Sequence, residues 1–327
     1  MKQLGIDISK ATFDACFLNG NRSRAKKFKN NNEGFEDLIK WLGERSFHDI
    51  HVCMEGTGKL WEKLAEFLQG KGFMVSVVNP MRVKGFGKSE MLRSKTDELD
   101  AALIARFCRA LKPQLWTPKC PVVKAVRDRQ RYVTELKAQI TAENNRLLAG
   151  PLDEQVAARI RAHVCFMQSS VEEVEAEIRK LIDQDEQLKA QKSLLCSIIG
   201  IGETTANIIL GELPEVSSFP NARAVELYCG IAPRNFESGS SVKARSRMSK
   251  VGNNKLRTAL FFPALAAMRS SPNIQKFCDR LLSKNKPKMV IVGAVMRKLL
   301  RIIFAVLKSG KPFCADYNSN LMTAPGY

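Results

Sequence analysis

The order of strand-like and helix-like segments in the first 111 residues limits the fold of this chain more than any other feature. The segments QLGIDIS, TFDACFL and RAKKFKN alternate well enough for a three-strand meander, and Asn19-Gly20 is a hairpin turn signal. Beyond them come a helical pattern at 31–45, a strand at 51–54, a helix at 60–69, a strand at 73–78 and a helix at 97–111. We therefore expect the order strand, strand, strand, helix, strand, helix, strand, helix.

That order is typical of an RNase H-like α/β domain, in which the first strand, the fourth strand and the last helix supply metal ligands. Four acidic residues stand on those three elements: Asp7, Glu55, Asp97 and Asp100. Asp97 and Asp100, three apart at the start of a helix, share one face. Carboxylate oxygens suit Mg²⁺, and two such ions about 3.5–4 Å apart can stabilise both the attacking and the leaving oxygen of a phosphoryl transfer. We expect these acids to form a catalytic Mg²⁺ site with two ions.

Each acid taken alone also has a structural interpretation. An Asp near a strand end, such as Asp7, can begin a turn, and Glu55 can be a solvated loop acid. The SKTD segment that ends at Asp97 matches a capping box, and acids in a first helical turn suit the helix dipole. The joint occurrence of four acids on the right elements favours the metal site.

The net charge of +19 is concentrated in one part of the chain. Between Ser218 and Lys311, 19 Lys or Arg stand against three acidic residues, a local net of +16, whereas the rest of the chain nets +3. Clustered cations release counterions when they bind a phosphate backbone, so this excess favours a nucleic-acid partner over a merely solvated surface.

The middle of the chain is predicted to be helical. Residues 122–188 contain few turn residues apart from Gly150-Pro151, which predicts an antiparallel hairpin of two long helices. A heptad seam follows Val164, Val171, Val174, Ile178 and Leu181. The seam fits packing within the hairpin or a dimer interface, and in either case a spacer or assembly arm.

Two shorter motifs lie in the last third of the chain. The segment SIIGIGETTANIILGEL, with Gly200 and Gly202, is typical of a helix-hairpin-helix, whose glycines let backbone N–H groups meet a DNA phosphate. A plain tight turn between helices is the alternative. Residues Ser238–Gly252 mix Ser, Gly, Lys and Arg with almost no apolar residues, so a loop is expected there.

Six motifs together resemble one family. GID, CMEGTG and KTDELDA, followed by GIGETTA, GIAPRNFESGSS and RMSKVGNNKLRTAL, resemble the insertion-sequence transposases with a DEDD catalytic domain, relatives of the Holliday-junction resolvase and of pilin-inversion recombinases. The resemblance covers nearly the whole chain. It implies a RuvC-like catalytic domain at 1–115, an antiparallel coiled-coil arm at 116–190, and a basic, mostly α-helical domain at 191–327 with a helix-hairpin-helix-like motif and a serine motif.

The resemblance also implies a reaction and its partners. It implies an RNA-guided recombinase that cleaves and rejoins donor and target DNA, directed by a noncoding bridge RNA and acting as a dimer or tetramer. Carried over residue by residue, the metal-binding quartet is Asp7, Glu55, Asp97 and Asp100, and the nucleophile is Ser238.

From the residues alone, Ser238 in a basic loop is more simply a hydrogen-bond donor to phosphate. Ser240 and Ser241 lie close enough to be alternatives as the nucleophile. Beside bound Mg²⁺ a serine needs no histidine base, which suits a chain with three histidines. Nucleic-acid contacts are expected from Gly200, Gly202, Arg234, Lys243, Arg245, Arg247, Lys250, Lys255 and Arg257.

Three other functions fit part of the sequence. A hydrolytic Holliday-junction resolvase-like nuclease would use the same acids with water as the nucleophile, and strand joining separates it from a recombinase. A sugar kinase of RNase H-like fold would explain GIDIS but has no use for the basic segment. A non-enzymatic nucleic-acid scaffold would show no metal-dependent cleavage.

The sequence also predicts where the protein works. No apolar run approaches the about 20 residues of a membrane span, and the first residues have no signal-peptide pattern. Nine cysteines are scattered singly, with no spacing typical of a zinc site or a disulfide framework. We expect a cytoplasmic protein with reduced thiols and no membrane partner.

Overall fold

The structure is a computed structural model that describes the chain except residues 44–46, 57, 92–96, 239–241 and 315–327, and except the side chains of residues 97–98 and 235–246. The chain forms two compact units, Met1–Pro118 and Lys119–Tyr327. The division into domains at 1–115, 116–190 and 191–327 stays a prediction.

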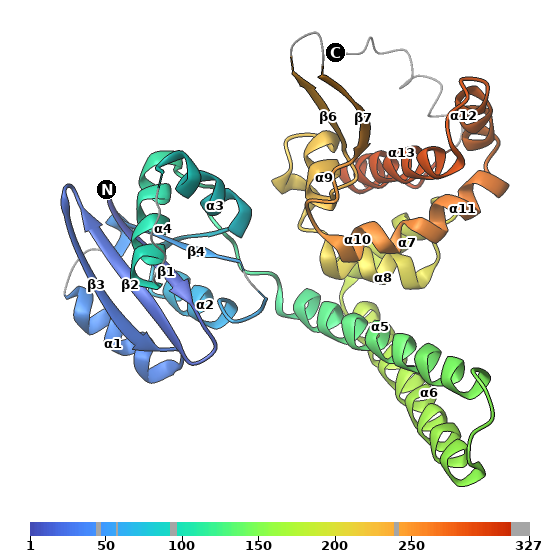
Figure 1. Cartoon of the computed structure of the whole chain (residues 1–327), viewed down its shortest axis with the longest axis horizontal. Helices are drawn as coiled ribbons and strands as arrows, with labels where there is room; N and C mark the ends of the chain where they lie inside the picture. The colour runs from blue at the N-terminus through green and yellow to red at the C-terminus, as the bar shows by residue number, and fades with distance from the viewer. Residues whose placement is uncertain (44–46, 57, 92–96, 239–241, 315–327) are drawn as a thin grey trace. The chain divides into compact units, whose positions relative to one another are not determined.

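The first unit is a five-stranded sheet with helices on both faces (Figure 1). The strand order is β3-β2-β1-β4-β5; the first three strands are antiparallel neighbours, whereas β4 lies parallel to both β1 and β5. The elements in chain order are β1 (Lys2–Ile8), β2 (Thr12–Asn19), β3 (Arg22–Lys29), α1 (Asn32–Leu42), the 3-10 turn η1 (Phe47–Asp49), β4 (Ile50–Glu55), α2 (Glu62–Gly70), β5 (Met74–Val78), α3 (Pro80–Ser89) and α4 (Asp97–Leu111).

Alternation along the central strands divides the core of this unit into two layers. Leu4 and Ile6 of β1 pack with residues of α1 and α2, including Leu38 and Leu64. On the other face, Cys53 of β4 packs with residues of α3 and α4. Successive strand residues point to opposite faces, so the odd-numbered positions of β1 and β4 face the α3–α4 layer.

The expected RNase H-like α/β fold is confirmed, with one additional helix. The sequence prediction passes from the fifth strand directly to the helix at 97, whereas the structure places α3 between them. Its start carries ordinary helix signals: Pro80 is the first helical residue, and the Asn79 side chain accepts a hydrogen bond from the backbone N–H of Met81, 2.8 Å away.

The second unit is mostly helical (Figure 1). Its first two helices form the predicted antiparallel hairpin, here called the arm, in which Val164, Val171 and Ile178 of α6 are buried in the same core as Val126 and Val133 of α5. The elements in chain order are α5 (Pro121–Leu148), α6 (Glu154–Asp183), α7 (Glu186–Cys196), α8 (Glu203–Glu212), the 3-10 turn η2 (Val216–Ser218), α9 (Ala222–Cys229), β6 (Pro233–Ser238), β7 (Val242–Met248), α10 (Asn254–Ala259), α11 (Phe261–Ser270), α12 (Pro272–Leu282) and α13 (Lys288–Ser309).

The prediction of a loop at Ser238–Gly252 is wrong for most of that range. Residues Val242–Met248 form β7, which pairs antiparallel with β6. The reason is visible in VKARSRM: small or apolar residues alternate with Lys and Arg, which is a strand period even though few of them are large apolar residues. Residues 239–241, with Ser240 and Ser241, lie outside the described part of the chain.

All nine cysteines are free thiols, and five of them are buried. Across the described residues, no helix combines the length and the apolar character needed to cross a membrane.

Candidate functional site

Asp7 and Glu55 lie on neighbouring parallel strands at the same end of the sheet. The register pairs Ile6 of β1 with Met54 of β4, and one further step along both strands brings Asp7 opposite Glu55. Ile6 and Met54 are fully buried, whereas the two acids are half-buried, so each strand leaves the core at its acidic residue. Neighbouring strands lie about 4.8 Å apart, a separation at which two carboxylates can share one cation. This end of the sheet is called the acidic edge below.

Helix α4 runs back along β1 and β4, so that its start is directed to the acidic edge. Near its end, Arg109 donates through Nη1 to the carbonyl oxygen of Gly20, in the turn after β2, at 3.0 Å. The Cys108 thiol lies 3.7 Å from the carbonyl oxygen of His51, at the beginning of β4. Because the end of α4 lies at the beginning of these strands, its first turn lies toward their ends.

Gly5 allows this helix to lie directly on β1. A Cβ at Gly5 would lie 2.2 Å from the carbonyl oxygen of Ala101 and 2.3 Å from the amide nitrogen of Ala105, distances that no side chain tolerates. Asp7 follows Gly5 on the same face of the strand, and position 97 precedes Ala101 by one helical turn on the same face of α4. The start of α4, which carries positions 97 and 100, is therefore directed toward the end of the sheet at which Asp7 and Glu55 lie.

The structure describes the side chains of three of the four acids. Asp100 is half-buried, and the side chain of Asp97 is not described. Among the described side chains, no three or more His, Cys, Asp or Glu lie close enough together to hold one metal ion. The structure thus places Asp7 beside Glu55 and directs the start of α4 toward them, and joint binding of a metal by the four predicted residues stays a prediction.

A fifth acid also lies at this edge, and the sequence analysis did not single it out. Asp14 of β2 pairs with Asp7 in the β1–β2 register. Its carboxylate lies 3.3 Å from the ammonium of Lys27 on β3, so it already has a cation partner.

A cation also lies near the strand that carries Glu55. Arg82, on the helix that the sequence prediction missed, lies with its guanidinium carbon 5.5 Å from the ring centre of Phe107. A hydrogen bond with Cys108 and burial raise the pKa of Cys53; the negative charge of Glu55 raises it further, and Arg82 opposes these effects. Arg82 is therefore close enough to β4, the strand that carries Glu55, for its positive charge to affect ionisable groups on that strand. The Asn79-Pro80 cap was the signal that could have located it.

Ser238 is the last residue of β6 and belongs to the second unit. It pairs with Val242 across the hairpin, so it stands at the turn end of the two strands. Its side chain is not described.

Several predicted nucleic-acid contacts fall on this same hairpin. Positions 243, 245 and 247 all lie on β7, where position 243 pairs with position 237 of β6 and Arg247 pairs with Arg234. Lys250 follows β7, is exposed, and has a positive φ of 58°. The hairpin thus gathers most of the predicted cations on one short element.

The remaining predicted contacts are more closely tied to the fold. Arg257 donates to the carbonyl oxygen of Cys229 at 3.1 Å, which joins α10 to α9. Gly200 has a positive φ of 95°, and a Cβ there would lie 2.6 Å from the carbonyl oxygen of Pro263, so packing against α11 explains its lack of a side chain. Gly202 is exposed and precedes α8 without a capping side chain. Lys255 is half-buried at the start of α10.

Comparisons with known proteins agree with these motifs. Residues 4–154 match the IS110 type of DEDD transposase domain, described as a transposase, and residues 192–279 match the domain described as Transposase IS116/IS110/IS902 family. The chain is 35% identical over 317 residues to the pilin gene-inverting proteins of Moraxella lacunata and Moraxella bovis, covering 95% of this chain and 97% of each relative.

A more distant relative covers much of the same length. The transposase for insertion sequence element IS1328 of Yersinia enterocolitica is 23% identical over 282 residues, which are 76% of this chain and 81% of the relative. The two family matches and the near-complete alignment at 35% identity lead to one assignment: the chain belongs to the IS116/IS110/IS902 family of DEDD transposases and is an enzyme that acts on DNA.

Proposed function

We propose that this transposase cuts and rejoins DNA at a Mg²⁺ site held by Asp7, Glu55, Asp97 and Asp100, with Ser238 as the nucleophile. The observation that carries the metal assignment is the acidic edge: two carboxylates on adjacent parallel strands, with the first turn of α4 directed to the same place. The donor atoms there are carboxylate oxygens, which suit Mg²⁺ better than a metal that prefers nitrogen or sulfur.

The proposed step forms and breaks one bond to phosphorus. Bound Mg²⁺ would polarise the scissile phosphate and favour the ionised serine hydroxyl. The Ser238 oxygen gives up its proton and bonds to phosphorus, while the bond from phosphorus to the departing sugar oxygen breaks and that oxygen takes up a proton. The serine ester keeps the bond energy of the cut strand, so attack by a DNA hydroxyl can rejoin the strands and restore Ser238. Arg245 and Arg247 of the same hairpin would stabilise charge on the phosphate.

Rejoining of cut DNA strands fits the activities for which both kinds of relative are named. The Moraxella proteins are named for inverting a pilin gene and the Yersinia protein for transposing an insertion sequence. Inversion and transposition both exchange the partners of cut DNA ends, so a covalent intermediate that conserves the bond serves either. Donor and target DNA are then the substrates.

We further propose that a noncoding bridge RNA directs the choice of DNA, and that the enzyme acts as a cytoplasmic dimer or tetramer. The resemblance of the six motifs implies RNA guidance, and the net charge of +16 between Ser218 and Lys311 supports binding to more than one polyanion. Sequencing the RNA that copurifies with the protein tests this directly. Recovery of random cellular RNA in place of one defined species would contradict guidance.

The metal assignment is tested by substituting the four acids one at a time. Asp7→Ala, Glu55→Ala, Asp97→Ala and Asp100→Ala should each abolish cleavage of DNA that matches the copurified RNA, while nucleic-acid binding and thermal stability stay near wild type. The matched control is Asp14→Asn, which removes a charge opposite Asp7 from a carboxylate that Lys27 already holds. Equal loss of activity in the control would mean that negative charge at this edge, and not a specific ligand set, is required.

The serine assignment is tested by trapping the ester. With Mg²⁺, RNA and a nicked DNA that blocks rejoining, a protein–DNA adduct should survive denaturation, and peptide mapping should place it on Ser238. An adduct that persists in Ser238→Ala would transfer the role to Ser240 or Ser241. Cleavage without any adduct would make water the nucleophile and the enzyme a resolvase-like nuclease. Mixing Asp7→Ala and Ser238→Ala proteins then asks whether different chains supply the two parts, because activity returns only in that case.

A further inference from the structure

The second unit contains a pocket of about 260 Å³ between α5, α8 and α10. Pockets for drug-sized ligands measure about 300–1,000 Å³, so this one suits a smaller group. Its walls include the apolar side chains of Ile208 and Ala259, and its mouth includes Lys255 and two exposed threonines, Thr134 and Thr258.

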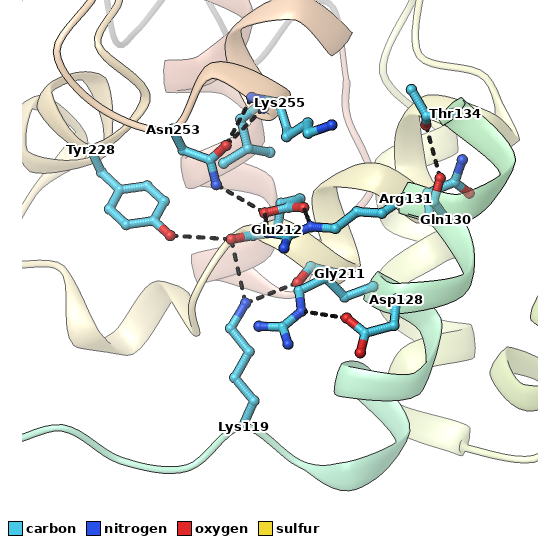
Figure 2. A network of polar contacts seen from close by, with 12 residues as sticks. Lys119, Asp128, Gln130, Arg131, Thr134, Gly211, Glu212, Tyr228, Asn253 and Lys255 are labelled. Carbon is cyan, nitrogen blue, oxygen red and sulfur yellow. Dashed lines mark hydrogen bonds and ion pairs between the residues drawn. The ribbon is translucent and has the colours of Figure 1, made fainter. Parts of the chain in front are cut away.

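A buried ion pair holds the three helices around this pocket (Figure 2). Glu212, at the end of α8, is 4% exposed and accepts hydrogen bonds from Nε and Nη2 of Arg131 on α5, at 2.5 and 2.9 Å. Asn253 donates to the same carboxylate at 3.0 Å, and its own side-chain oxygen accepts from the backbone N–H of Lys255 at 2.9 Å. The start of α10 is therefore fixed to α8 and α5 through one carboxylate.

The charges within this network are matched. Burial opposes ionisation of Glu212, but the hydrogen bonds from Arg131 and Asn253 outweigh it and hold the pKa of Glu212 below its ordinary value. Glu212 thus neutralises Arg131. Lys255, by contrast, has no carboxylate or other hydrogen-bond partner for its ammonium group within the described part of the chain. One uncompensated cation remains at the mouth.

Gln130 supplies a polar group in the wall of the pocket. It lines the pocket and is 5% exposed, yet its side-chain amide makes no hydrogen bond to any described residue. Its amide is therefore available to a group that enters the pocket. An amide presents a donor and an acceptor side by side, which is the pattern that pairs with the edge of a nucleobase.

We propose that this pocket receives one unpaired nucleotide, with its base between the apolar walls and against Gln130 and its phosphate on Lys255. The inference rests on the proposed function only in that the ligand is nucleic acid. A base inside a duplex cannot enter such a pocket, so the nucleotide must come from a single strand or be extruded from the stack. Single-stranded DNA and RNA share this chemistry.

Two tryptophan substitutions on α5 test the pocket in the full-length protein. Thr134 and Thr141 are both exposed and both donate to the carbonyl oxygen four residues earlier, at 2.8 and 2.9 Å, but only Thr134 lines the pocket. The probes are short single-stranded DNA and RNA oligonucleotides that contain one fluorescent adenine analogue, with binding followed by anisotropy. Thr134→Trp should weaken binding about tenfold or more, the loss expected for one recognised base, and Thr141→Trp should leave it unchanged.

Fluorescence of the analogue should change on binding to wild type and to Thr141→Trp, and not on binding to Thr134→Trp. The type of oligonucleotide that shows the change, DNA or RNA, identifies the source of the nucleotide. Wild-type affinity in Thr134→Trp, or equal weakening in both variants, would overturn the proposal.

Gln130→Met tests how the base is recognised, because methionine has a similar volume and no amide. The wild-type protein should prefer one base among oligonucleotides that differ at the labelled position, and the variant should lose that preference while still binding. A wild-type protein with no base preference would overturn the role of Gln130. The proposed function is tested separately, because Asp7→Ala should bind these oligonucleotides as wild type does even though it cannot cleave.

Discussion

Replacing Gly5 with alanine tests whether the contact between β1 and α4 assembles the acidic edge. The added methyl group would lie 2.2 Å from the carbonyl oxygen of Ala101 and 2.3 Å from the amide of Ala105. Because ordinary contact needs about 3.5 Å, α4 must withdraw by about 1 Å. Overpacking of this kind costs about 1–3 kcal/mol, which lowers the melting temperature of the unit by several degrees. A shift of about 1 Å in reacting groups can cost about a hundredfold in rate, so cleavage should fall much further than the folded fraction does.

The matched control is Gly34→Ala, which produces a similar clash on the opposite face of the sheet. A Cβ at Gly34 would lie 2.0 Å from the carbonyl oxygen of Lys29 and would displace α1, not α4. Thermal unfolding with and without Mg²⁺, and cleavage measured well below the melting temperature, should separate the two variants. Both should melt earlier, but only Gly5→Ala should lose cleavage and the stabilisation that a bound metal confers. Wild-type cleavage in Gly5→Ala, or equal losses in both variants, would refute the reasoning.

Two further predictions concern the second unit. Replacing Arg245, Arg247 and Lys250 together with alanine should reduce the slope of log affinity against log salt concentration by about 0.9 for each phosphate that these cations neutralise in the wild-type complex. Nucleic-acid titration at several salt concentrations measures this slope. An unchanged slope would place the phosphate-binding cations elsewhere. The Glu212 carboxylate, whose pKa is lower in the folded than in the unfolded protein, should contribute stability that is complete above its ordinary pKa of 4.5 and is lost as the pH falls below that value. Melting curves across this range should show the loss in wild type and a flatter pH dependence in Glu212→Gln, which should be the less stable protein at neutral pH.

The sequence predicted the sheet of the first unit because its strands carry clear alternation and its helices clear amphipathic patterns. It missed α3 because that helix contains two glycines and buries little apolar surface. Gly87 lowers helix propensity, yet a Cβ there would lie 2.9 Å from the side chain of Leu103 on α4. Tertiary packing therefore requires the residue that weakens the local signal. In β7 the alternation is present, but its small members include Ala244 and Ser246, which do not mark a buried strand.

For the candidate site, sequence reasoning located residue types but not their geometry. Asp7 and Glu55 could be placed at strand ends, and the parallel pairing of those strands then brings them together. The direction of α4 is set by contacts between residues far apart in the sequence, among them Gly5 with Ala101 and Arg109 with Gly20, which no local pattern reveals. The pocket beside Gln130 is formed by three helices distant in sequence, so nothing in the neighbourhood of Gln130 predicts it.

The arm has a mechanical consequence that follows from how its base is held. The 28 residues of α5 extend about 42 Å, more than the about 34 Å of one turn of DNA. At the base, a Cβ on Gly211 would lie 2.8 Å from the Cα of Arg127, and Arg131 is hydrogen-bonded to Glu212, so α5 and α8 are packed tightly against each other there. A force that acts on the far end of the arm is therefore transmitted through α5 to the helices that line the pocket. Binding of a partner at the end of the arm can in this way change the shape of the pocket that is proposed to hold a single nucleotide.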